Sequence, residues 1–125
     1  MLTKLEIEGT RDTAYILFDK ENNLFEIKGN SLPENTNKFF EPIFDWIEHY
    51  LQDPNTDTNL KCDLEYFNSS SAKMIYQIFI EFEKILEHGN DVSISWYFES
   101  GDALIEEKGM EYKTILNIPF NLIEK

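Results

Sequence analysis

The chain has 125 residues, which suits one domain with its own hydrophobic core, and we assign residues 1–125 to a single domain. Its 42% share of hydrophobic residues and 14% share of aromatic residues exclude a disordered chain. The formal net charge of -13 argues against nucleic acid and anionic membranes as partners, because an acidic surface repels both.

Cysteine usage and the length of the apolar runs indicate the compartment. Cys62 is the single cysteine, so the sequence has no disulfide framework and fits a reducing environment, and its alternating context favours a small core residue. The longest apolar run, residues 14–18, is too short to span a membrane. Lys4, Glu6 and Glu8 interrupt the first apolar positions, so no signal peptide is expected. We therefore expect a cytoplasmic protein.

The first third of the chain is predicted to form strands. Residues 5–7 are a short first candidate. Residues 14–18 and 24–28 then flank a polar loop, residues 19–23, whose length suits a β-hairpin. Residues 29–33, Gly-Asn-Ser-Leu-Pro, break the strand pattern.

A first helix is predicted next, because apolar residues recur at helical spacing: Phe39, Phe40, Ile43, Phe44, Ile47, Tyr50 and Leu51. Asn35, Thr36 or Asn37 can serve as its N-cap. Pro42 lies inside the pattern and is expected to kink or delay the helix, since its ring removes a hydrogen bond. The Asp-Pro-Asn turn at residues 53–55 should end the helix.

The second half alternates strands and helices. Residues 60–66 form an alternating strand that leads into three serines. A second helix follows, with an apolar stripe made of Ile75, Ile78, Phe79, Phe82, Ile85 and Leu86, and Gly89 and Asn90 should end it. Residues 92–98 are predicted as the next strand, residues 102 to about 110 as a short third helix, and residues 113–118 as a last strand stopped by Pro119.

These elements predict an α/β fold with a mixed sheet. Lys61, Asp63 and Glu65 alternate with apolar residues, whereas a sheet covered on both faces would show continuous apolar runs. We therefore expect the helices to pack mainly on one face, with the other face at least partly wet. The strand–helix–strand unit at residues 60–98 should be a right-handed crossover.

No catalytic constellation emerges from the sequence. His49 and His88 lie near the ends of different predicted helices, where the helix dipole favours them without any function. The sequence has no metal-ligand spacing, Gly-rich phosphate loop or nucleophile elbow. We therefore expect neither an enzyme nor a bound metal or cofactor, with a small carboxylate-based enzyme as a less favoured alternative.

The stretch Asn68-Ser69-Ser70-Ser71 joins the central strand to the second helix. A hydroxyl there can cap the helix, and the free N–H groups and the dipole can also accept a phosphate. We expect Ser69 or Ser70 to be the N-cap. Spacing alone favours a plain cap over a phosphorylation switch, because such caps are common.

A candidate docking surface continues from Ser69 down the second helix. With about 100° per residue, Lys73, Tyr76 and Ile80 fall within about 40° of the direction of Ser69. Because the core stripe lies on the far side, Tyr76 and Ile80 are expected to form an exposed apolar strip suited to protein docking. The alternative is that a sheet or loop covers them.

The order of elements resembles the STAS domains of anti-sigma-factor antagonists. Within that architecture the sequence more closely resembles the SiaC-like family of bacterial regulatory phosphoproteins. Two segments carry the resemblance: residues 29–35 (GNSLPEN), followed by the aromatic-rich helix with Asp45, Trp46, Ile47 and Glu48, and residues 64–73 (LEYFNSSSAK).

The resemblance implies a STAS-like switch protein without enzymatic activity, cycled by a protein kinase and a PP2C-like phosphatase. In the family a Thr directly after the Asn accepts the phosphate, and that position here is Ser69, with Ser70 as the next candidate. The unmodified form would bind and activate a target such as a diguanylate cyclase, which implies a role in cyclic-di-GMP signalling and biofilm control. The partner-binding surface is expected to contain Pro33, Glu34, Asn35, Asn68, Ser70, Ser71, Lys73, Tyr76 and Ile80.

Two other functions stay open at this point. The same domain could act on an anti-sigma factor or a histidine-kinase-like protein. It could also be a scaffold in which the serines only cap a helix. The identity of the target, the direction of regulation and the oligomeric state do not follow from the sequence.

Overall fold

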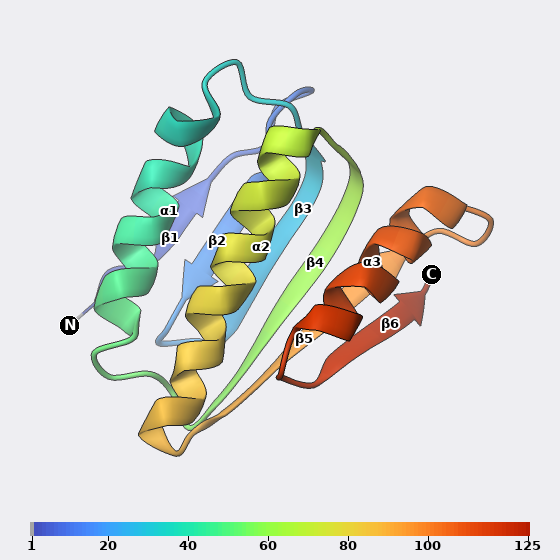
Figure 1. Cartoon of the computed structure of the whole chain (residues 1–125). Helices are drawn as coiled ribbons and strands as arrows, with labels where there is room; N and C mark the ends of the chain where they lie inside the picture. The colour runs from blue at the N-terminus through green and yellow to red at the C-terminus, as the bar shows by residue number, and fades with distance from the viewer. Residues whose placement is uncertain (1) are drawn as a thin grey trace.

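Six strands form one mixed sheet whose spatial order follows the order of the chain. The computed structural model describes residues 2–125 (Figure 1). The strands are β1 (Leu5–Ile7), β2 (Tyr15–Asp19), β3 (Leu24–Ser31), β4 (Asp57–Phe67), β5 (Asp91–Phe98) and β6 (Phe120–Glu124). The helices are α1 (Thr36–Tyr50), α2 (Ser69–Glu83), the 3₁₀ turn η1 (Lys84–His88) and α3 (Ala103–Ile115).

The pairing explains why the helices share one side of the sheet. β1, β2 and β3 pair antiparallel, whereas β3, β4, β5 and β6 pair parallel. Each parallel step passes through a helix and moves to the next strand in the same direction, in the right-handed sense (Figure 1). Successive crossovers of one hand and one direction place α1, α2 and α3 on the same face. The predicted α/β fold, with helices mainly on one face, is confirmed.

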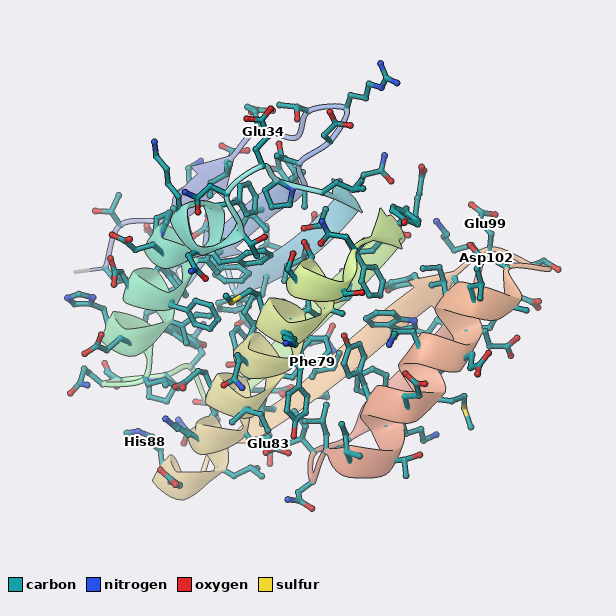
Figure 2. All side chains as sticks on the ribbon, turned by 45° about the horizontal axis from the view of Figure 1, so that its top comes forward. Glu34, Phe79, Glu83, His88, Glu99 and Asp102 are labelled. Atoms are coloured by element: carbon teal, nitrogen blue, oxygen red, sulfur yellow. The ribbon has the colours of Figure 1, made fainter. Side chains whose placement is uncertain are left out.

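The core lies between the helices and the covered face of the sheet, and aromatic rings dominate it. One group of rings packs beneath α1 and α2: Phe18, Phe25, Trp46, Tyr50 and Phe82. A second group packs beneath α2 and α3: Phe79, Trp96, Tyr112 and Phe120. Phe79 points from α2 toward α3 (Figure 2). The central helix α2 therefore contributes to both halves of the core.

Within residues 2–125 the opposite face of the sheet carries no helix, and it is polar, as the alternating pattern predicts. Lys28 forms an ion pair with Glu26 at 3.6 Å, and the Lys125 ammonium lies 2.7 Å from a carboxylate oxygen of Asp63. Burial, by contrast, raises the pKa of the Cys62 thiol on the covered face. Cys62 is therefore the small core residue that the sequence predicts.

Two predicted boundaries in the first half are wrong. The segment from Gly29 does not end the strand, because β3 continues to Ser31 through a bulge between Gly29 and Asn30, with φ +100° at Gly29. The expected delay of the first helix by Pro42 is wrong, because α1 already begins at Thr36 with Asn35, one of the predicted caps, as its N-cap; the expected kink stays a prediction. The helix accommodates the missing N–H of Pro42 without ending.

The predicted last strand is also wrong. Residues 113–115 belong to α3, and the strand lies after Pro119, as β6 (Phe120–Glu124). Leu116 and Ile118 imitate a strand pattern, but they are buried in the connection between α3 and β6. Pro119 therefore precedes the final strand instead of stopping it.

Candidate functional site

The two segments that flank the predicted site meet at one end of the sheet. β3 and β4 are parallel neighbours, so the loops at their carboxyl ends lie side by side. The backbone N–H of Asn68 donates to the carbonyl oxygen of Ser31 at 3.1 Å, which fixes the start of α2 to the end of β3. Residues 31–36 and 68–73 therefore form one continuous rim.

The cap of α2 is Asn68, so the prediction that Ser69 or Ser70 caps the helix is wrong. The Asn68 Oδ1 accepts a hydrogen bond from the backbone N–H of Ser71 at 2.9 Å. Asn is at least as good an N-cap as Ser, and its extended backbone places the amide oxygen over the first turn. Ser69 is therefore the first helical residue, and its side chain is not needed for capping.

The three serine hydroxyls have different surroundings. Ser71 is fully buried, and its hydroxyl donates to the Ser31 carbonyl oxygen at 2.9 Å. Ser70 is exposed, but its hydroxyl lies 2.9 Å from the Thr36 hydroxyl and 3.2 Å from the Asn68 Oδ1. The Ser69 hydroxyl is exposed and has no hydrogen-bond partner within residues 2–125. Of the three, Ser69 is thus the most accessible to another molecule.

The electrostatic setting of Ser69 suits an anion. The first N–H groups of a helix have no partner inside it, and the dipole places partial positive charge there. Lys73, one turn further along α2, is exposed and adds a full positive charge. A phosphate on Ser69 would thus meet favourable charge without rearrangement of the helix.

Several residues predicted to bind a partner are exposed on the rim, and two are not. Glu34 and Asn35 are exposed, and Glu34 projects from the loop ahead of α1 (Figure 2). Pro33 and Ser71 are buried, so their side chains are not available to a partner. We use the name Ser69 surface for the remaining rim residues: Glu34, Asn35, Asn68, Ser69, Ser70 and Lys73.

The predicted apolar strip below Ser69 is only half exposed. The ring of Tyr76 stacks on that of Tyr112 from α3, with centroids 6.3 Å apart and an interplanar angle of 7°. Ile80 is half-buried and lines a shallow groove with Leu86 and Asn117. The expectation of an exposed strip is therefore only partly correct, because α3 packs beside α2 and covers one edge of it.

Thr36 also lies on the rim, although the sequence pointed to it only as a possible N-cap of the first helix. It is the first residue of α1, and its hydroxyl contacts Ser70, 34 positions later in the chain. One sequence signal points to it. Asn35-Thr36 repeats the pattern of Asn68-Ser69, an Asn cap followed by a hydroxyl residue at the helix start.

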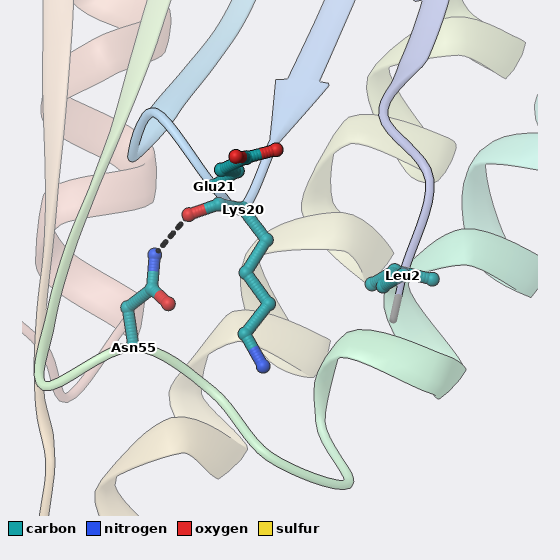
Figure 3. A pocket seen from close by; sticks show the side chains of 4 residues that line it. All are labelled: Leu2, Lys20, Glu21 and Asn55. Atoms are coloured by element: carbon teal, nitrogen blue, oxygen red, sulfur yellow. Dashed lines mark hydrogen bonds between the residues drawn. The ribbon is translucent and has the colours of Figure 1, made fainter.

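The rim is not the place of the pocket described next, and a search of residues 2–125 found neither a metal-binding cluster nor a membrane-spanning helix. A pocket of about 430 Å³ at the opposite end of the sheet is lined by Leu2, Lys20, Glu21 and Asn55 (Figure 3). In residues 2–125 no cluster of three or more His, Cys, Asp or Glu residues could hold a metal ion. Within the same residues no helix has the length and apolar character needed to cross a bilayer.

Comparison with known proteins identifies the family. A model of the family described as SiaC family regulatory phosphoprotein matches residues 7–125. The chain belongs to the SiaC family. An uncharacterized protein of Pseudomonas aeruginosa strain UCBPP-PA14 is 29% identical over 119 residues, which cover 95% of this chain and 94% of that protein.

Solved structures of the SiaC family have the same fold. SiaC of Pseudomonas aeruginosa matches with a TM-score of 0.88 and 29% identity, covering 98% of this chain and 99% of that one. A chain in the crystal structure of the diguanylate cyclase SiaD in complex with its activator SiaC, from the same organism, matches with a TM-score of 0.90 and 29% identity. That match covers 97% of this chain and 99% of the other. The predicted resemblance is thereby confirmed.

Proposed function

We propose that this SiaC family protein is a phosphorylation-controlled switch for protein–protein binding. Its unmodified form binds a target protein through the Ser69 surface, and a phosphate on Ser69 prevents binding. A protein kinase adds the phosphate and a PP2C-like phosphatase removes it. The observation that carries the proposal is the exposed, unpartnered hydroxyl of Ser69 at the first position of α2.

The proposed target is a diguanylate cyclase in the cytoplasm, which the unmodified protein activates. The support is the relation to SiaC of Pseudomonas aeruginosa, which is the activator of the diguanylate cyclase SiaD and forms a crystallised complex with it. The similarity in fold extends over almost the whole of both chains. The switch would thus regulate the production of cyclic di-GMP without catalysis by this protein.

The physical effect of the phosphate is local. It brings about -1.5 to -2 charges and strong acceptor oxygens to the start of α2. The free N–H groups and Lys73 stabilise the anion, so the domain stays folded. A partner packed against Ser69 would have to desolvate this anion and make room for it. Binding is therefore lost by steric and electrostatic conflict at the interface and not by refolding.

Phosphorylation and target binding can be tested together. The protein is incubated with its kinase and Mg-ATP, the modified residue is located by phosphopeptide mass spectrometry, and binding to the cyclase is measured by calorimetry. We expect one phosphate on Ser69 and a loss of affinity of at least about 30-fold, which corresponds to the lower end of the 2–5 kcal/mol penalty of an unpaired charge in an interface.

Matched variants separate the site from general effects. Ser69→Ala should abolish modification of that site while it keeps target binding, and Ser100→Ala, at an exposed loop serine, should leave both unchanged. A phosphate found at neither Ser69 nor Ser70 would overturn the proposal. Unchanged affinity of the phosphorylated protein would equally contradict it.

A further inference from the structure

Two exposed serines stand side by side at the start of α2, yet their hydroxyls are bonded differently. The Ser69 hydroxyl has no hydrogen bond within residues 2–125. The Ser70 hydroxyl lies 2.9 Å from the Thr36 hydroxyl and donates to the Asn68 Oδ1 at 3.2 Å. The difference comes from tertiary contact, because Thr36 belongs to α1 and not to the helix that carries the serines.

The direction of these hydrogen bonds follows from the number of protons. A serine hydroxyl has one proton to donate, and Ser70 gives it to the Asn68 Oδ1. The contact between Thr36 and Ser70 must then use the proton of Thr36, with the Ser70 oxygen as acceptor. The Asn68 Oδ1 is itself held by the backbone N–H of Ser71 at 2.9 Å. The Ser70 hydroxyl is thus held on both sides, by a donor and by an acceptor.

This bonding opposes reaction at Ser70. In phosphoryl transfer the hydroxyl oxygen attacks the γ-phosphorus of a nucleoside triphosphate and forms a new O–P bond. The bond from the γ-phosphorus to the bridging oxygen breaks, the nucleoside diphosphate leaves, and the hydroxyl proton passes to a base of the kinase. Ser70 would first have to release its proton from Asn68 and turn its oxygen away from Thr36. Ser69 has neither requirement.

We propose that Thr36 is a specificity-determining residue for the modification, because its hydroxyl holds Ser70 and so directs phosphoryl transfer to Ser69. The inference rests on the proposed function, since it requires a kinase that acts at the start of α2. Thr36 acts as a positioning residue, without contact to the transferred phosphate. This role of Thr36 would explain how a kinase selects one of two adjacent serines.

The test compares the rates of phosphorylation at the two serines in variants of Thr36. Thr36→Val removes the hydroxyl and keeps the branched shape of the side chain. Thr36→Ala removes both the hydroxyl and the branch, and Thr36→Ser keeps a hydroxyl without the methyl group. Initial rates at Ser69 and Ser70 are measured separately by phosphopeptide mass spectrometry, with the kinase and Mg-ATP. The same variants are also made with Ser69→Ala, so that only Ser70 remains.

The expected result is a change at Ser70 alone. Thr36→Val and Thr36→Ala should raise the rate at Ser70 about five- to tenfold, the factor that corresponds to one neutral hydrogen bond. Thr36→Ser should stay within about twofold of the wild type, since the hydroxyl that holds Ser70 is restored. The rate at Ser69 should not change in any Thr36 variant, which also shows that the start of α2 is intact.

Two outcomes would overturn the inference, and they are distinguishable. If Ser69 is phosphorylated but the rate at Ser70 is the same with and without the Thr36 hydroxyl, the role of Thr36 is refuted and the switch remains. If no variant is phosphorylated at either serine, the proposed function fails and the inference fails with it. A rise at Ser70 in Thr36→Val that Thr36→Ser does not show supports the role of the hydroxyl.

Discussion

The carboxamide oxygen of Asn68 accepts two hydrogen bonds on the rim. Its oxygen caps α2 through the Ser71 backbone N–H and also accepts the Ser70 hydroxyl, while the backbone N–H of the same residue is bound to Ser31. One side chain thereby stabilises the helix start and restrains a neighbouring hydroxyl. Because Asn68 caps α2, the side chain of Ser69 is not needed to stabilise the start of the helix.

The capping role of Asn68 predicts the effect of its removal. Asn68→Ala should lower the free energy of unfolding by about 1–2 kcal/mol, since it removes a cap and leaves the Ser71 N–H without its partner. Asn68→Asp should retain most of the stability, because a carboxylate accepts the same hydrogen bond. Urea denaturation followed by circular dichroism measures both.

The matched control is the N-cap of α1. Asn35 caps α1 in the same way, accepting from the Lys38 backbone N–H at 3.0 Å. Asn35→Ala should cost about 1 kcal/mol. Equal stability of the wild type and Asn68→Ala would show that another group replaces the cap.

At the scale of elements, the packing of α3 decides the shape of the surface beside α2. Tyr112 donates its hydroxyl to the Ala72 carbonyl oxygen at 2.9 Å, and the Trp96 indole N–H donates to the Ile105 carbonyl oxygen at 3.0 Å. Burial raises the pKa of Tyr112, which keeps its hydroxyl protonated as a donor. These bonds tie α3 to α2 and to β5, and they explain why Tyr76 is only half exposed.

The close contact of α3 with β5 predicts an unusual effect at Gly109. A Cβ at this position would lie 2.5 Å from the Trp96 Cδ1 and 2.6 Å from its Nε1. Trp96 cannot move aside without losing its bond to Ile105. Gly109→Ala should therefore destabilise the protein by about 1–3 kcal/mol, although the same change in an exposed helix stabilises it by about 1 kcal/mol.

Thermal or urea unfolding of Gly109→Ala tests this packing. The control is Glu107→Ala, an exposed position of the same helix, which should stay within about 0.5 kcal/mol of the wild type. A gain in stability for Gly109→Ala would mean that α3 can shift away from Trp96 without loss.

At the scale of the whole molecule, acidic residues outnumber basic ones, with 24 Asp and Glu against 11 Lys and Arg. Two lysines on the open face of the sheet pair with carboxylates: Lys28 with Glu26 at 3.6 Å, and Lys125 with Asp63 and Glu99 at 2.7 and 3.3 Å. The net charge of -13 means that acidic groups remain in excess after these pairings. Such an excess destabilises the compact state by self-repulsion.

Salt should consequently stabilise this protein. Raising the NaCl concentration from 0.1 to 1 M shortens the Debye length from about 10 Å to about 3 Å, which screens the repulsion. We expect the urea midpoint of unfolding to rise. Glu107→Lys makes the net charge less negative and should weaken the dependence of stability on salt. Lys113→Glu makes the net charge more negative and should strengthen that dependence. A midpoint that falls with salt would show that ion pairs outweigh the net repulsion.

Most of the fold could be predicted from local patterns. The alternation of Lys61, Asp63 and Glu65 with apolar residues correctly predicts a strand with one wet face. The apolar spacing predicts α1 and α2, and Gly89 ends the second helical segment in the left-handed conformation expected of it. The error at the last strand arose because Leu116 and Ile118 are buried in a connection, and burial alone produces the same alternation as a strand.

The sequence by itself determined the class of fold, the family and the stretch from Asn68 to Ser71, because these depend on periodicity and on residues adjacent in the chain. Only the tertiary structure decided which hydroxyl there is free. Ser71 is buried against Ser31, and Ser70 is held by Thr36 across 34 positions of sequence. Both contacts exist because β3 and β4 pair in parallel and bring two distant loops to one edge. No local pattern contains that pairing, so the free hydroxyl of Ser69 is a property of the fold.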